Sequence, residues 1–155
     1  MTVKAYEVVL VEGLQHSSWQ AVAFLRCADK NVNALPVFGR LSRNNDMELR
    51  TRFDCWIGGV HHKQWFHGWD DPRYRDCFVF KSKDHRFYGF LCHPMSGTNK
   101  RFRACILCSH ATKSDWNTDK KELKRAQQLL LDPAVQAAIK AAFPETEVGG
   151  TTWLN

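Results

Sequence analysis

Three segments rich in β-forming residues follow one another in the second half of the chain, and the short connections between them restrict its fold more than any other feature. They are Cys77–Lys83, Arg86–Cys92 and Arg101–His110. Asp84 and His85, residue types that tolerate a tight turn, separate the first two. Parallel neighbours would need about a dozen or more connecting residues. The spacing therefore predicts a three-stranded antiparallel meander.

The N-terminal part of the chain predicts a strand followed by a short helix. Val3–Val11 is rich in β-branched residues, which favour strands. Ser17 and Ser18 can cap a helix over about Trp19–Ala28. Because this helix is apolar on most sides, we expect it to be buried. The pattern gives no assignment for residues 29–44.

A longer helix is predicted between this part and the meander. Asn45 or Asp46 can act as its N-cap, and Gly58 with Gly59 ends it. Its apolar residues recur at i, i+4, i+7 and i+8, the spacing of one helix face. These residues are Leu49, Phe53, Trp56 and Ile57. We therefore expect that face to be buried.

Two helices are predicted after the meander. The first, Asp119–Leu131, places its apolar residues on one stripe and begins behind Thr118, which can act as its cap. Asp132 and Pro133 match a cap followed by proline at the first helical position. A second helix therefore begins there, and Pro144 ends it.

The order of these elements predicts an α+β fold. We expect a small twisted antiparallel sheet, made of the N-terminal strand and the meander, packed against the N-terminal helices and followed by the C-terminal helices. A chain of 155 residues suits a single domain of this kind. Its expected parts are an N-terminal extension (1–45), a core (46–131) and a C-terminal helix and tail (132–155).

Composition and charge favour a cytoplasmic protein with a polyanionic partner. Lys and Arg outnumber Asp and Glu by 22 to 16, and the net charge of +6 favours nucleic acid. The six cysteines are too few for a disulfide scaffold, and we interpret them as reduced thiols. Apolar stretches such as Ala21–Leu25 are far shorter than the ~20 residues of a membrane span. The first residues do not resemble a signal peptide, so we expect no membrane partner.

Cationic side chains share faces in every predicted strand of the meander. Side chains two residues apart lie on the same face of a strand. The pairs are Lys81 with Lys83, Arg86 with Tyr88, and Arg101 with Arg103. Ammonium and guanidinium groups on one sheet face can bind a phosphodiester backbone. The alternative is that they are ordinary solvated side chains.

The same strands carry a known order of motifs. Cys-Phe-Val-Phe-Lys at 77–81 is followed by His-Arg-Phe-Tyr-Gly-Phe at 85–90. An aliphatic strand, Cys-Ile-Leu-Cys-Ser-His-Ala-Thr-Lys at 105–113, then leads into a helix with Glu and Ala. With these motifs, the run Met47–Leu131 resembles the RelE/ParE toxin superfamily of toxin–antitoxin systems, in particular its HigB-like branch.

The resemblance implies a toxin that cleaves mRNA, free or on the ribosome, without a metal or other cofactor, and that a cognate antitoxin restrains. The ribose 2′-hydroxyl would attack the adjacent phosphate, which requires a proton acceptor, cations for the developing charge and a proton donor for the 5′-oxygen. Lys81, where relatives commonly carry Arg, and Arg86 would stabilise the phosphate. His110 would move a proton, Lys113 matches the Lys after the last strand, and Tyr88 would stack or donate a proton.

Two other functions remain open for a chain with this resemblance. One is a non-catalytic module of the same fold that binds nucleic acid or protein. The other is a ParE-like inhibitor of a DNA topoisomerase. Cleavage of transcripts without added divalent metal distinguishes the ribonuclease from both.

Residues 60–74 mix aromatic and basic side chains. This mixture is typical of single-stranded RNA binding, where bases stack on rings while cations hold phosphates. The RNA-binding residues predicted in this loop and on the strand faces are Lys63, Trp65, Trp69, Lys83, Arg101 and Arg103. The alternative for Trp65 and Trp69 is that they pin the loop onto the sheet. For Trp56, on the apolar helix face, we favour burial.

A zinc site is the rival interpretation of this loop. Its candidate ligands are Cys55, His61, His62, His67 and Asp70. They lack the paired spacings of most zinc ligands. Cys105 and Cys108 have such a spacing, but on a strand their sulfurs point to opposite faces. We therefore expect core cysteines and polar surface histidines, and no metal.

Overall fold

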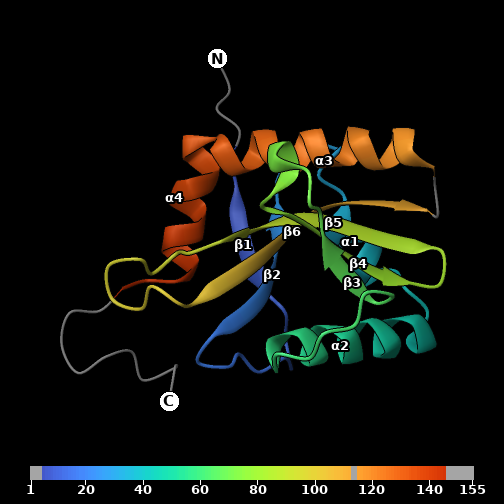
Figure 1. Cartoon of the computed structure of the whole chain (residues 1–155), viewed down its shortest axis with the longest axis horizontal. Coiled ribbons are helices and arrows are strands. Elements are labelled where there is room, and N and C mark those ends of the chain that lie inside the picture. Colours follow the sequence, from blue (N-terminus) through green and yellow to red (C-terminus); the bar gives the residue numbers. More distant parts are fainter. Residues whose placement is uncertain (1–4, 113–114, 146–155) are drawn as a thin grey trace.

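The structure is a computed structural model that describes residues 5–112 and 115–145, and within these residues six strands form one mixed sheet (Figure 1). The strands are β1 (Glu7–Leu10), β2 (Gln20–Arg26), β3 (Phe66–Gly68), β4 (Cys77–Ser82), β5 (His85–Cys92) and β6 (Arg103–Thr112). Their order across the sheet is β1-β2-β6-β5-β4-β3. β2 and β6 run parallel, while the other neighbouring pairs are antiparallel.

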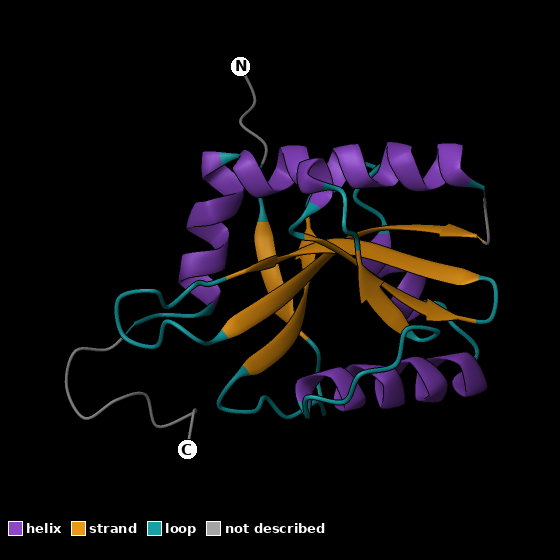
Figure 2. Cartoon of the chain, in the orientation of Figure 1, coloured by secondary structure: helices purple, strands orange, loops and turns teal. Residues whose placement is uncertain are grey.

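Helices cover both faces of this sheet, so the fold is α+β as predicted (Figure 2). In the described part of the chain the α-helices are α1 (Ala34–Gly39), α2 (Arg43–Ile57), α3 (Trp116–Leu131) and α4 (Pro133–Ala142). α1 and α2 pack on one face, and α3 and α4 pack on the other. A short 3-10 helix, Pro72–Tyr74, precedes β4. Among these residues no helix combines the length and apolarity needed to cross a membrane.

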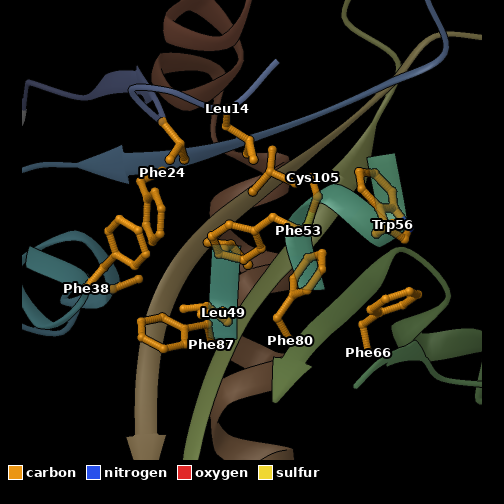
Figure 3. Packing of buried hydrophobic residues seen from close by; sticks show 14 of the residues in the cluster. Leu14, Phe24, Phe38, Leu49, Phe53, Trp56, Phe66, Phe80, Phe87 and Cys105 are labelled. Atoms are coloured by element: carbon orange, nitrogen blue, oxygen red, sulfur yellow. The ribbon is translucent and has the colours of Figure 1, made fainter. Parts of the chain in front are cut away.

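The face under α1 and α2 is packed with aromatic rings (Figure 3). Phe53 of α2 meets Phe80 of β4 edge-on with ring centroids 4.9 Å apart, and Phe24 of β2 lies 4.9 Å from Phe38 of α1. The predicted apolar face of α2 is confirmed, since its residues are all buried: Leu49, Phe53, Trp56 and Ile57. Aromatic pairs contribute about 0.5–1.5 kcal/mol each beyond the burial of their area. This packing fixes the strands whose other face is covered by α3 and α4.

The predicted meander is confirmed. β4, β5 and β6 are successive antiparallel neighbours in the sheet. Lys83 and Asp84 form the turn between β4 and β5, and Lys83 adopts a left-handed backbone conformation with φ of 53°. The turn lies one residue earlier than the predicted Asp84-His85, because His85 already pairs with Ser82.

Two helices begin earlier than predicted because other residues cap them. The Ser42 side chain accepts the N–H of Asn45 and caps α2. The Asp115 side chain accepts the N–H of Thr118 and caps α3, so Thr118 lies inside that helix. α4 begins at the predicted proline, with the side chain of Asp132 as its cap.

The helix predicted over Trp19–Ala28 is wrong, because this segment contains β2. Residues 20–25 are buried throughout, since β2 lies between β1 and β6 and helices cover both faces of the sheet. A strand covered on both faces is apolar on both sides, and this pattern also fits a buried helix. With β2 and the short β3, the sheet has six strands instead of four, and the parallel pairing of β2 with β6 makes it mixed instead of antiparallel. Residues of the predicted N-terminal extension, such as Phe24, Leu25 and Phe38, are buried in the cores.

Candidate active site

A small polar pocket lies on the α3 face of the sheet, and we call it the basic pocket. Its volume is about 160 Å³. Its walls come from β3 and the residue that follows it, from β4 and β5, and from the first turn of α3. The lining residues are His67, Trp69, Val79, Lys81, Arg86, Tyr88 and Asp119.

Strand register explains why these side chains meet. Lys81 of β4 lies directly opposite Arg86 of β5, and Val79 lies opposite Tyr88. On the other side of β4, His67 of β3 is also paired with Val79. Cross-strand partners and alternate residues share a face. The five side chains therefore project from one side of the sheet, toward α3.

The two cations of the basic pocket stand side by side, and Asp119 is the acid that lines the pocket with them. Neither Lys81 nor Arg86 takes part in any salt bridge found among the described residues. Burial, and then repulsion by Arg86, lowers the pKa of Lys81 from its ordinary value, against the opposing attraction of Asp119. Like charges directly opposite on neighbouring strands are destabilising. The pocket is therefore electrostatically prepared for an anion.

The floor of the basic pocket is held by a bond between β5 and α3. The buried Tyr88 hydroxyl donates a hydrogen bond to the carboxylate of Asp119. Asp119 lies in the first turn of α3, whose start is fixed by the Asp115 cap. The Trp69 ring lies above Tyr88 with centroids 6.4 Å apart and planes at 24°. Tyr88 is thus enclosed by a ring on one side and tied to a carboxylate at its tip.

His67 supplies the basic pocket with a proton acceptor. Its Nδ1 lies 2.8 Å from the carbonyl oxygen of Gly68. Because a carbonyl oxygen only accepts hydrogen bonds, we assign the ring proton to Nδ1 and the free lone pair to Nε2. Burial lowers the pKa of His67 and Lys81 lowers it further, against the opposing effect of the Gly68 hydrogen bond. The ring is therefore a neutral base near pH 7.

Of the predicted catalytic residues, Lys81, Arg86 and Tyr88 come together in the basic pocket, whereas His110 lies on the opposite face. The His110 ring packs 4.9 Å from Phe87, and its Nε2 lies 2.9 Å from Nδ1 of His85. His110 pairs with Phe87 of β5, so it shares the face of α1 and α2. Burial, and then His85, lowers the pKa of His110 to about 4.

Lys113 lies outside the described residues. Neither His67 nor Asp119 was predicted as a catalytic residue. β3 has three residues, too few for an alternating pattern, and Asp119 lies on a helix rather than a strand. The one signal for His67 was its place in the His- and Trp-rich loop.

The predicted RNA-binding residues are dispersed. Trp69 lines the basic pocket, and Lys63 and Arg103 line another cavity, of about 370 Å³. Lys83 is exposed in the β4–β5 turn. Arg101 is exposed just before β6. It lies at the opposite end of β6 from Ala111, the residue that pairs with Arg86.

The surroundings of Trp65 fit the alternative interpretation, in which this ring pins the loop onto the sheet. The ring of His62 stacks on it at 3.9 Å with planes at 10°, and the Arg52 guanidinium lies 5.1 Å from its centroid. It also packs, half-buried, against the aromatic core. Through these contacts the Trp65 ring holds the loop against the sheet. Trp56 is buried, as favoured.

The structure also shows how the candidate metal ligands and the cysteine pair Cys105 and Cys108 are arranged. Within residues 5–112 and 115–145, no cluster of three or more His, Cys, Asp or Glu side chains is placed to hold a metal ion. The predicted divergence of Cys105 and Cys108 is confirmed, because the two belong to the cores on opposite faces of the sheet. Burial raises the pKa of both thiols, so neither is a reactive thiolate.

Comparison with known proteins adds no relative. No protein-family model, no curated protein and no solved structure matches this chain. We therefore infer a function from the chemistry of the basic pocket.

Proposed function

We propose that this protein is a metal-independent endoribonuclease that cleaves mRNA, free or on the ribosome, as the resemblance to RelE/ParE toxins of the HigB-like branch implies. A cognate antitoxin is then its expected protein partner. The observation that carries the proposal is the pair of part-buried cations, Lys81 and Arg86, which lie side by side and form no salt bridge among the described residues. Asp119 is the acid that lines the pocket, and a phosphodiester group supplies a further anion for the two cations.

The proposed reaction starts with His67. Its Nε2 takes the proton of a ribose 2′-hydroxyl, and the 2′-oxygen forms a bond to the adjacent phosphorus. The bond between phosphorus and the 5′-oxygen breaks, which leaves a 2′,3′-cyclic phosphate and a 5′-hydroxyl. A positioned base of this kind contributes about 10²–10⁴-fold to the rate.

Lys81 and Arg86 complete the proposed chemistry. Because burial and Arg86 lower the pKa of Lys81, its ammonium is a better acid than that of an ordinary lysine, and it protonates the leaving 5′-oxygen. Arg86 keeps its charge and holds the phosphate oxygens as charge develops. The Tyr88 hydroxyl proton points at Asp119, so we assign Tyr88 to the pocket floor and not to proton donation. Exchange with water restores both titrating groups.

The test is cleavage of a transcript by the purified protein in EDTA, with and without ribosomes. We expect fragments that end in a 2′,3′-cyclic phosphate and a 5′-hydroxyl, and no cleavage at a position carrying a 2′-deoxyribose. RNA that stays intact in both conditions contradicts the proposal. Growth arrest with intact transcripts would then favour a ParE-like topoisomerase inhibitor. Absence of both arrest and cleavage would favour a non-catalytic binding module.

A further inference from the structure

The basic pocket is one end of a longer groove that passes the end of β3. A second cavity, of about 530 Å³, shares His67, Trp69 and Lys81 with the basic pocket. A third, of about 370 Å³, shares Lys63, His67 and Gly68 with the second. Because neighbouring cavities share these lining residues, the three lie in a row past the end of β3. We call this row of cavities the edge groove.

The edge groove connects the two faces of the sheet. One end is the basic pocket, on the face of α3. The other end is bounded by Trp56, near the end of α2, and by Gln20 and Arg103, the first residues of β2 and β6. β3 is the edge strand and ends at Gly68, so the groove passes around the end of the sheet.

The middle of the edge groove carries cations that are free to bind an anion. Lys63 and Arg75 line it, both are exposed, and neither forms a salt bridge with another described residue. Arg73, close by in the sequence, differs because its guanidinium is paired with Asp71 at 2.7 Å. The acid that lines this part of the groove is Asp70.

The far end of the edge groove combines an oriented cation with aromatic rings. The Arg103 guanidinium donates to the Gln20 side-chain oxygen, with Nε at 3.1 Å, and lies 5.6 Å from the centroid of the Trp56 ring. Phe66 and Phe78 line the same end but are only 5% and 7% exposed, and the half-buried Trp69, which lines the middle of the groove, is the more accessible ring. Cations beside aromatic surface are the combination that binds single-stranded nucleic acid, since phosphates meet charge while bases meet rings.

We propose that the edge groove binds single-stranded RNA on one side of the cleaved linkage. Lys63 and Arg75 contact consecutive phosphates, and the partly exposed ring of Trp69 supplies surface for a base. The inference rests on the proposed function, because the groove ends at the pocket where cleavage is placed. A duplex keeps its base faces inside the helix and cannot use this ring, so the groove selects unpaired RNA.

The test measures binding without cleavage. The probe is a 2′-O-methyl RNA of about ten nucleotides, which has no free 2′-hydroxyl to attack the phosphate, and the readout is fluorescence anisotropy. A Lys63→Ala/Arg75→Ala double variant is compared with Lys124→Ala/Lys140→Ala, which removes the same charge from exposed positions on α3 and α4. Circular dichroism checks that both variants are folded.

We expect the groove variant to bind about tenfold more weakly, and its salt dependence to fall by about 1.4 in slope, since each phosphate contact on a single strand contributes about 0.7. The control variant keeps wild-type affinity, and a duplex of the same sequence binds more weakly than the single strand. Equal affinity of the groove variant and wild type overturns the inference. So does equal binding of the duplex, or tighter binding of an acidic peptide that the groove substitutions abolish.

The two proposals fail separately in this design. If the wild-type protein cleaves no RNA but the groove variant loses probe binding, the RNA-binding role of the groove is supported and the ribonuclease activity is refuted. If the wild-type protein cleaves RNA but the groove variant binds the probe like wild type, the ribonuclease activity is supported and the RNA-binding role of the groove is refuted.

Discussion

Gly89 gives the sharpest test of the strand packing behind the basic pocket. It follows Tyr88 at the irregularity in the β5–β6 register. A Cβ atom at this position would lie 2.0 Å from the carbonyl oxygen of Ile106 and 2.8 Å from Cα of Leu107. Both are backbone atoms, so no rotamer change relieves the contact. Gly89→Ala therefore forces β5 and β6 apart.

The size of the effect follows from the geometry. A contact of 2.0 Å must open to at least about 3 Å, the closest approach that real Cβ atoms show. A separation of about 1 Å breaks the two or three ladder hydrogen bonds nearest the site, each contributing about 1 kcal/mol. Core packing on both faces is disturbed as well, which adds about 1–3 kcal/mol. We expect Gly89→Ala to lower the free energy of unfolding by about 3–6 kcal/mol.

Urea unfolding followed by circular dichroism measures this change. The matched control is Gly39→Ala at the end of α1, where an added Cβ meets no atom within 4 Å. We expect the control to be neutral or slightly stabilising, because alanine suits a helix better than glycine by up to about 1 kcal/mol. A loss of less than 1 kcal/mol in Gly89→Ala would refute the close approach of β5 and β6.

Three further predictions concern the histidines and the pocket floor. The pKa of His110 is about 4 in the folded protein and near 6.5 in the unfolded chain. Between these pH values the unfolded chain therefore binds a proton that the folded protein does not. The stability of the fold consequently falls as the pH drops from about 6.5 to about 4. Discounted for the partial exposure of the ring, we expect a loss of about 1–2 kcal/mol in urea unfolding, which His110→Gln reduces; an unchanged pH dependence in that variant would contradict the assignment. His67→Gln should slow RNA cleavage by about 10²-fold whereas His110→Gln should not, and the reverse result in a timed cleavage assay would return the base to β6. Tyr88→Phe should lower the free energy of unfolding by about 1 kcal/mol because Asp119 loses its donor, and a thermal melt identical to wild type would show that this bond contributes nothing.

Patterns that depend on one face of an element could be predicted from the sequence. The apolar stripe of α2 and the meander β4–β6 follow such patterns, because one side of α2 faces solvent and the meander has short connections. β2 could not be predicted. It is covered on both faces, so its apolar residues show no alternation and its parallel partner β6 lies far along the chain.

The candidate site was predictable only where it lies on regular strands. Arg86 and Tyr88 share a face because strands alternate, and the sequence alone indicates this, whereas Lys81 joins them through its pairing with Arg86. The face of His110 could be known only from the pairing of β6 with β5, which places it beside Phe87. His67 enters the pocket through a three-residue edge strand, too short to leave a pattern in the sequence.

The central claim is that Lys81 and Arg86 together hold the scissile phosphate. The most direct measurement is the single-turnover rate of RNA cleavage in EDTA by Lys81→Ala, by Arg86→Ala and by Lys124→Ala, an exposed cation on α3 outside the basic pocket. We expect each pocket substitution to slow cleavage by about 10²-fold or more, as removal of a transition-state donor does, and Lys124→Ala to cleave at the wild-type rate. Wild-type cleavage by either pocket variant would show that the two cations do not hold the phosphate.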